Sequence, residues 1–319
     1  MKKFAAAMVS LAVLASSGAM AEEAWPSKTV KLIVPYAPGG YTDLTGRITA
    51  RFLEKDLGQT VVVENKPGAG GIVGTDFVSK SAPEGYTFCI CSVGAVSVAP
   101  VAQKTSYDPM KDLDPISIVS SIPQTVIVNP KLPIKSIPEL IAYAKANPGK
   151  LTYGSSGAGG LMNYSVQLFD ARTGIDLVHV PFKGGAPATA AVVSGEVDLS
   201  FTNMTDALPQ MEANTVRGLA VTSAKRSPFA SDLPTIEESG VKDYVVESWN
   251  GVIAPKGTPQ AIIDRMSAAL KKMAEDPEVK AAFAKIGATP VYTTPAEFSA
   301  SISREVKQWA GLMDVIKAK

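Results

Sequence analysis

Three short glycine-rich segments contain the residues of this chain that could bind a small anion. They cover 34–43, 153–160 and 180–187, and each follows an apolar run and precedes an amphipathic stretch. The first N–H groups of a helix have no partner within it and lie at the positive end of the helix dipole, so a strand-to-helix junction suits an anion. No cluster of reactive side chains accompanies the three segments. The pattern therefore favours capture of a ligand over catalysis.

Hydroxyl and amide groups gather at these junctions and at the ends of predicted strands. Gly39 and Gly40 expose the backbone before Tyr41 and Thr42, while Asp43 is better explained as a partner of the helix dipole than as a ligand contact. Lys183 is explained equally well as a solvated surface residue. The other candidates, beside free N–H groups or at the carboxyl ends of strands, are Ser155, Ser156, Gly157, Ser92, Ser97, Thr202 and Asn203.

Other kinds of chemistry find less support in the residues. Segment 154–158 is close to a nucleophile elbow, but Ala158 occupies the place of the last glycine. The sole histidine, His179, has no nearby Ser, Cys or acid in a triad arrangement, and one histidine with two thiols gives too few ligands for a metal enzyme. The glycines of 67–71 lack the spacing of a dinucleotide fingerprint. We therefore expect no cofactor, no metal and no enzymatic activity, with an exported hydrolase that uses a serine of 154–160 as the alternative.

Strands and helices alternate along the chain and position these segments. Predicted strands are 30–34, 60–64, 87–91, 117–119, 125–128, 151–153, 177–180, 197–201, 217–222 and 245–254, and predicted helices include 42–57, 71–81, 160–173, 186–195, 260–274 and 296–316. This alternation predicts an α/β fold with parallel sheets covered by helices. About 300 residues usually form two domains, and the smooth composition favours two domains joined by more than one crossing.

The first residues have the features of an export signal. Lys2 and Lys3 precede the apolar stretch 4–14, and Ala19-Met20-Ala21 is a small-x-small cleavage site. We expect cleavage after Ala21 and a periplasmic location. Loss of the two lysines changes the formal net charge from +1 to about −1, and a nearly neutral chain without a basic run argues against nucleic acid or an anionic membrane surface as a partner.

Cys89 and Cys91 lie two residues apart in predicted strand 87–91, so they would share one face of it. Two cysteines do not make a disulfide scaffold, and a redox or metal role needs more partners than these. The prediction is two small buried residues of a core strand.

The chain resembles the extracytoplasmic solute-binding proteins of tripartite tricarboxylate transporters, the TctC or Bug-type family. Segments that match the family's motifs occur in the right order over nearly the whole mature chain: 34–43, 64–71, 180–188, 195–198, 219–223, 233–240 and 249–259. The resemblance implies a type II periplasmic-binding fold, in which two α/β domains joined by a hinge close over a small organic carboxylate. It also implies delivery of that ligand to the permease subunits of a tripartite transporter, by a protein that we expect to be a monomer.

The expected domains are 22–123 with 247–319, and 124–246, after the signal peptide 1–21, with hinge crossings near 120–128 and 244–250. Family members often have a histidine where this chain has Asn163 or Tyr164. The ligand could be a dicarboxylate, a tricarboxylate, an aromatic acid or an acidic amino acid, and a sensing subunit for a membrane kinase is a further alternative to transport. With the residues that the resemblance adds, the expected ligand-binding set is Tyr36, Gly39, Gly40, Tyr41, Thr42, Asp43, Ser92, Ser97, Ser155, Ser156, Gly157, Asn163, Lys183, Gly184, Thr202 and Asn203.

Overall fold

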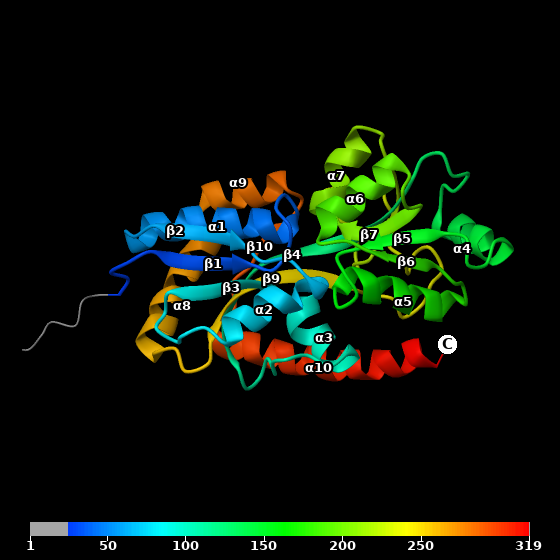
Figure 1. Ribbon diagram of the computed structural model, residues 1–319. Helices are drawn as coiled ribbons and strands as arrows, with labels where there is room; N and C mark the ends of the chain where they lie inside the picture. Colours follow the sequence, from blue (N-terminus) through cyan, green and yellow to red (C-terminus); the bar gives the residue numbers. More distant parts are fainter. Residues whose placement is uncertain (1–24, 319) are drawn as a thin grey trace, which may run out of the picture.

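The computed structural model describes residues 25–318, which form two α/β lobes side by side (Figure 1). The predicted export signal, residues 1–21, lies outside the described residues. Within 25–318, no helix has both the length and the apolar character needed to cross a membrane.

The first lobe is built on a sheet whose parallel strands β2, β1 and β3 lie side by side, with β1 in the centre. Its elements from the N-terminal part of the chain are β1 (Val30–Val34), α1 (Tyr41–Leu57), β2 (Val61–Asn65), the short 3₁₀ turn η1 (Ala69–Gly71), α2 (Ile72–Ser79), β3 (Thr87–Ser92), the π-helical turn η2 (Gly94–Val98) and α3 (Ala99–Ala102). The C-terminal part adds α8 (Gln260–Glu275), α9 (Pro277–Lys285), β10 (Thr289–Pro290) and α10 (Pro295–Lys317). Figure 1 shows α10 running beneath the lobes.

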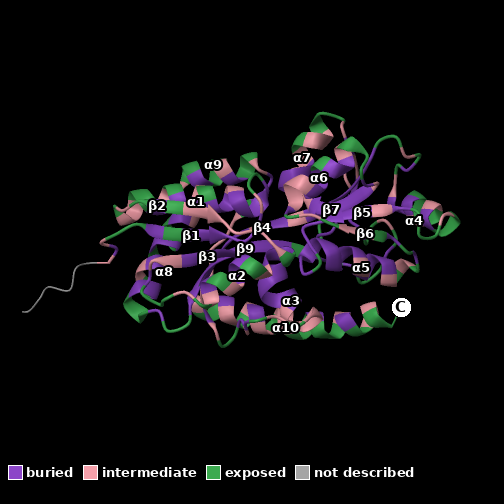
Figure 2. Cartoon of the chain, viewed as in Figure 1, coloured by how far each residue is buried: buried purple, intermediate pink, exposed green. Residues whose placement is uncertain are grey.

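The second lobe repeats the alternation of strand and helix. Its parallel strands β7, β5 and β6 are neighbours in the sheet, and its elements are α4 (Ile137–Ala146), β5 (Thr152–Ser155), α5 (Leu161–Thr173), β6 (Val178–Pro181), α6 (Gly185–Ser194), β7 (Leu199–Asn203), α7 (Met204–Glu212) and β8 (Arg217–Val221). The central strands of both lobes are buried beneath the helices (Figure 2). The predicted α/β fold is therefore confirmed.

Two long antiparallel strands connect the lobes. They are β4 (Leu113–Val128) and β9 (Glu247–Pro255). The part of β4 up to Pro123 pairs with β9, whereas the part from Gln124 onward pairs with β7 and β8 of the second lobe. The sequence analysis expected two separate strands here, at 117–119 and 125–128. Continuous pairing to a neighbouring strand on each side carries one strand across the polar residues Ser120 and Ser121.

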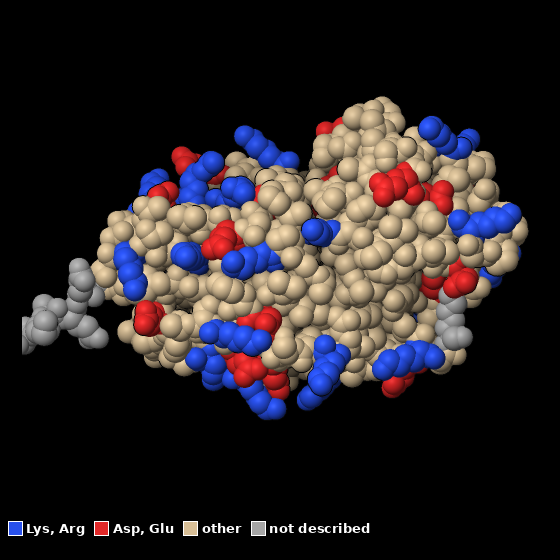
Figure 3. Space-filling model, viewed as in Figure 1, with Lys and Arg blue, Asp and Glu red and all other residues tan. Residues whose placement is uncertain are grey.

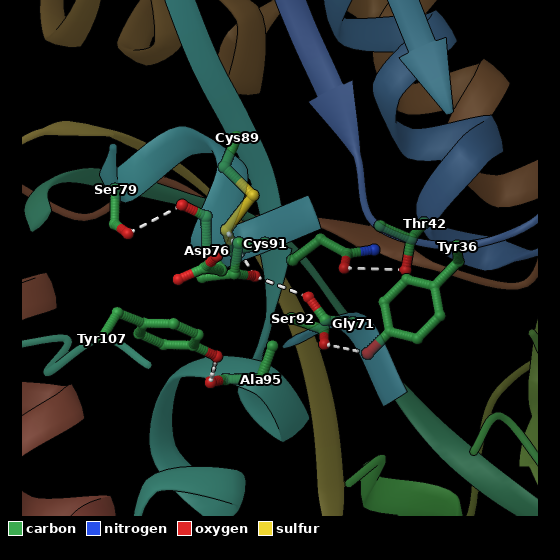
Figure 4. Close-up of a disulfide and its surroundings, with 12 residues drawn as sticks. Tyr36, Thr42, Gly71, Asp76, Ser79, Cys89, Cys91, Ser92, Ala95 and Tyr107 are labelled. Carbon is green, nitrogen blue, oxygen red and sulfur yellow. Dashed lines mark hydrogen bonds between the residues drawn. A yellow bond between two sulfur atoms is a disulfide. The ribbon is translucent and has the colours of Figure 1, made fainter. Parts of the chain in front are cut away.

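The two cysteines are linked to each other (Figure 4). Cys89 and Cys91 form a disulfide within β3, with their Cα atoms 5.2 Å apart, and both residues are completely buried. The prediction of burial in a core strand is confirmed, whereas the bond between the two sulfur atoms was not predicted. Side chains two residues apart on one face of a strand lie within the Cα separation that a disulfide can span.

Basic and acidic side chains are interspersed over both lobes on the face shown in Figure 3. Among the residues that the structure describes, some opposite charges are paired, including Lys256 with Asp114 at 2.7 Å and Arg265 with Asp56 at 2.7 Å. This face therefore carries mixed charge rather than one broad patch of a single sign.

Candidate functional site

A narrow cleft lies between the lobes and has an empty volume of about 430 Å³ including its mouth. The β1–α1 loop and the end of β3 form the wall on the first lobe, and the loops that open α5, α6 and α7 form the wall on the second. Gln124 of β4 and Ser248 of β9 complete it from the connecting strands. The lining residues are Tyr36, Ala37, Gly40, Tyr41, Thr42, Ser92, Gln124, Ser156, Leu161, Met162, Gly185, Asn203, Asp206 and Ser248.

Four helices begin at this cleft. The N-cap residues of α1, α5 and α6 are Gly40, Gly160 and Gly184, which have no side chain to accept a hydrogen bond from the first turn. The N-cap of α7 is Asn203, and its side chain makes no capping hydrogen bond either. The first amides of a helix have no partner within the helix, so these termini offer free N–H donors and positive dipole ends. Such an arrangement favours a bound anion.

Tyr36 and Ser92 support the wall on the first lobe (Figure 4). The hydroxyl group of Tyr36 donates to the carbonyl of Gly70 at 2.7 Å and lies 2.7 Å from Oγ of Ser92. Burial raises the pKa of Tyr36 to about 12, against the opposing effect of the Ser92 hydrogen bond, so the phenol stays protonated at neutral pH. Thr42 donates to Oδ1 of Asn250 at 3.2 Å.

Gly39 and Asp43 hold the β1–α1 loop in shape and do not line the cleft. The Asp43 carboxylate accepts from the Gly39 N–H at 2.9 Å, from Arg47 at 2.9 and 3.0 Å, and from Asn65 at 2.9 Å. Burial alone would raise the pKa of Asp43, but these hydrogen bonds outweigh burial and hold the pKa below its usual value. The contacts favour a structural role for Asp43.

Most of the candidate residues in segment 153–160 contact other parts of the protein and do not line the cleft. Ser156 lines the cleft, but Ser155 is completely buried with its Oγ 2.6 Å from Nε2 of His179. The sequence did not predict this Ser155–His179 contact, which the parallel pairing of β5 with β6 brings about. Gly157 contacts the opposite lobe. Asn163 accepts from the Tyr153 hydroxyl at 2.6 Å and donates to a loop carbonyl at 2.8 Å, outside the cleft lining.

The remaining candidates also lie beside the cleft rather than on its surface. Ser97 donates to Glu305 at 2.7 Å, and the Lys183 side chain is exposed. Gly184 is the N-cap of α6. Thr202 accepts from Thr189 at 3.0 Å. Of the sixteen expected residues, the structure brings together at the cleft surface Tyr36, Gly40, Tyr41, Thr42, Ser92, Ser156 and Asn203.

Sequence reasoning missed Gln124, Ser248 and Asp206. Gln124 and Ser248 lie within long strands, where no glycine or loop marks them. Asp206 follows β7 by three residues, so its position at the carboxyl end of a strand was a usable signal. It is 7% exposed, and burial raises its pKa to about 7 despite a 3.4 Å hydrogen bond from Thr202. Between residues 25 and 318, no lining side chain is basic.

Small residues allow the two lobes to touch on both sides of the cleft. The N–H of Ala37 in the first lobe donates to the carbonyl of Lys183 in the second at 2.9 Å. On the other side, a Cβ atom placed on Gly157 would lie 2.6 Å from the backbone nitrogen of Gly70. We call the contact between Gly70 and Gly157 the glycine seam. In this structure the two lobes are therefore in direct contact with each other.

Comparison with known proteins identifies the family. A model of the tripartite tricarboxylate transporter family receptors matches residues 45–318. The chain belongs to this family. Protein BugT of Bordetella pertussis is 36% identical to this receptor over 299 residues, which are 93% of the receptor and 92% of BugT. An R. palustris protein solved with adipate is 34% identical with a TM-score of 0.88, covering 92% of the receptor and 98% of that protein.

MatC from Rhodopseudomonas palustris, solved with bound malate, is 29% identical to the receptor. Its TM-score is 0.87, and the match covers 91% of the receptor and 100% of MatC. These matches confirm the resemblance stated from the sequence and the two-domain fold of the periplasmic-binding type. The described part of the receptor contains no group of three or more His, Cys, Asp or Glu residues that could hold a metal ion.

Proposed function

We propose that this receptor captures a small organic carboxylate in the cleft between its lobes, without chemical turnover, and delivers it to the permease subunits of a tripartite transporter. The observation that carries the proposal is the convergence of four helix N-termini, none capped by a side chain, on one narrow cleft. Two relatives were solved with the carboxylates adipate and malate, which supports the ligand class.

The expected binding residues divide into two groups under this proposal. Those at the cleft surface, among them Thr42, Ser92 and Ser156, contact the ligand with hydroxyl groups and backbone amides. Those beside it hold the loops in place: Asp43 fixes the β1–α1 loop, and Asn163 fixes the loop before α5.

Capture couples to closure of the lobes. The proposed domains are 22–123 with 247–319, and 124–246, and the change of pairing partner in β4 after Pro123 supports this division. Closure excludes water and strengthens the hydrogen bonds to the ligand. The predicted export signal with cleavage after Ala21 supports action in the periplasm, and we expect the mature receptor to act as a monomer.

One contact favours the alternative of an exported hydrolase, namely the Ser155–His179 pair at 2.6 Å. Against it, Ser155 is completely buried and is absent from the cleft lining, so its hydroxyl does not reach a ligand there. Incubation with a panel of esters and amides distinguishes the hydrolase from the receptor. A receptor leaves the esters and amides unchanged. Steady hydrolysis that is abolished by Ser155→Ala would favour the hydrolase instead. The alternative of a sensing subunit shares the capture step with transport. The membrane protein that co-purifies with the receptor distinguishes them: a kinase indicates sensing, and permease subunits indicate transport.

The binding proposal is tested by removing two cleft hydroxyl groups. Thermal-shift screening of organic acids first identifies a binder, and calorimetry then measures its dissociation constant. We expect Thr42→Val with Ser156→Ala to weaken binding at least tenfold, because Ser156→Ala removes a hydroxyl group from the cleft surface and Thr42→Val removes the hydrogen bond to Asn250 that fixes its side chain at the start of α1. Thr49→Val is the matched control, since Thr49 lies on the same helix, is completely buried and is not part of the cleft. Equal affinity in all three proteins would contradict the proposed site.

A further inference from the structure

The cleft offers hydrogen-bond acceptors as well as donors, and the acceptors gather where α7 begins. The unpaired Nε2 of Gln124 is a buried donor, in keeping with the free helix amides around it. In contrast, Oδ1 of Asn203 is a buried acceptor without a partner, and Asp206, three residues later, adds a carboxylate. A plain carboxylate ligand uses the donors only. The acceptors therefore suit a second ligand group, one that donates hydrogen bonds.

Asn203 and Asp206 occupy the positions at which a helix start is usually stabilised by its own side chains. Asn203 is the N-cap of α7 and Asp206 is its third residue, the two positions of a capping box. The Asn203 side chain nevertheless makes no capping hydrogen bond, and within residues 25–318 the Asp206 side chain has one hydrogen bond, the 3.4 Å contact with Thr202. Both side chains line the cleft instead. An acidic residue in the first turn of a helix is ordinarily explained by its interaction with the helix dipole. That interaction does not explain why two side chains at capping positions leave the helix uncapped and line the same cavity.

The Asp206 carboxylate lies where the lobes meet. A Cβ atom on Gly40, the N-cap of α1, would lie 3.4 Å from Oδ1 of Asp206, and a Cβ atom on Gly185 would collide with Oδ2. The carboxylate thus fills space that Gly185 leaves open, and it lies within van der Waals reach of Gly40 on the other lobe. A buried carboxylate without a cationic partner is costly, so its place in a ligand cleft calls for a positive group that arrives with the ligand.

We propose that the receptor selects carboxylates that also carry an amino group, such as α-amino acids, with the ligand carboxylate on the free helix amides and its ammonium group between Asp206 and Asn203. An ammonium group has three donors and no acceptor, which fits one carboxylate and one amide oxygen. This inference rests on the proposed function and narrows its ligand class. Plain dicarboxylates would place a second negative charge near Asp206.

The titration of Asp206 adds a readout to this inference. Its raised pKa means that part of the protein holds a neutral Asp206 at neutral pH. Binding of an ammonium group favours the ionised form, so the affinity should rise as the pH increases through about 7. The other titratable side chains of the two hollows that Asp206 lines are Tyr36 and Tyr41, and burial raises the pKa of both. Neither phenol changes its charge in this range.

The test compares acids that differ only by an amino group. Calorimetry on the intact mature protein measures succinate against aspartate, glutarate against glutamate, adipate against 2-aminoadipate, and propionate against alanine. We expect the best amino-bearing probe to bind at least tenfold tighter than its plain counterpart, with affinity that rises from about pH 5 to about pH 8. Asp206→Asn should remove both the preference and the pH dependence, and it should tighten binding of the plain diacids because a negative charge is gone.

Glu305→Gln is the matched control, because Glu305 is a carboxyl group with a raised pKa that bonds to Ser97 and Trp249 outside the cleft lining. It should leave preference and pH dependence unchanged. If plain acids bind as tightly as their amino counterparts and Asp206→Asn keeps the same ranking, the inference is overturned while capture of a carboxylate stands. If none of the eight probes binds but another organic acid of the thermal-shift screen does, the inference is overturned and the proposed function stands. If no organic acid binds, both are overturned.

Discussion

At the scale of single residues, Asp43 shows how an acid in an anion-binding loop serves the protein rather than the ligand. Its carboxylate ties Gly39, Arg47 and Asn65 together while staying almost completely buried. Its pKa lies below the usual value, so its stabilising contribution is present above the ordinary carboxyl pKa and is lost as the pH falls through the lowered value.

We therefore expect Asp43→Asn to lower the free energy of unfolding by about 1–3 kcal/mol at neutral pH, because hydrogen bonds to a charged group are lost. The difference from the wild type should shrink as the pH approaches 3 in urea titrations. Glu238→Gln removes an exposed pair with Arg226 and should change stability little. An Asp43→Asn effect that stays constant down to low pH would contradict a role for the ionised carboxylate.

The residue types of the anion-binding junctions were readable from the sequence, whereas several neighbours were not. Gly40, Thr42 and Ser156 stand out because glycine and hydroxyl residues follow apolar runs. Asp206 was missed because Pro209, inside α7, breaks the helical pattern, so the helix that positions it was not expected. The disulfide was not predicted for another reason. Two thiols and a disulfide produce the same alternating pattern in a sequence, so the bond between Cys89 and Cys91 is visible only in the structure.

At the scale of elements, the glycine seam lets the loop before α5 approach the turn η1 of the other lobe. Gly157 has a φ of +116°, and an added methyl group would meet the backbone of Gly70. We expect Gly157→Ala to hold the lobes apart and to weaken binding of the best probe at least tenfold. Gly174→Ala is the control, because Gly174 also has a positive φ, +67°, but nothing lies within 4 Å of the added Cβ.

Both alanine variants strain the backbone, so comparable losses of melting temperature are expected from that cause. The loss of affinity should be confined to Gly157→Ala. Calorimetry and thermal melts on the two purified variants measure this directly. Equal affinities would show that the seam does not control closure.

At the scale of the whole molecule, the proposed capture requires a second form in which the lobes lie further apart and the ligand can enter. We expect X-ray scattering to give a larger radius of gyration without ligand than with the tightest probe of the screen at saturation. The Gly157→Ala protein should stay close to the unliganded value in both conditions. Superimposable wild-type curves with and without the probe would rule out closure as the response to binding.

The two-lobed architecture was predictable because strand and helix alternate through both halves of the chain, and a chain of this length exceeds a single core. The continuity of β4 was not, since Ser120, Ser121 and Pro123 interrupt its apolar pattern. Hydrogen bonds to β9 keep this part of the chain extended, and pairing with a strand so distant in the sequence cannot be recognised from the local residue pattern.

The unbroken path of β4 through both lobes limits how the molecule can move. A flexible linker would let one half rotate freely, but here the single strand β4 pairs with β9 in the first lobe and with β7 and β8 in the second. We therefore expect opening to appear as added twist of β4 near Pro123, where its pairing partner changes. We expect a small, reproducible opening in which the two lobes change little in relative orientation. The receptor would then present nearly the same surface to a membrane partner each time it opens and closes.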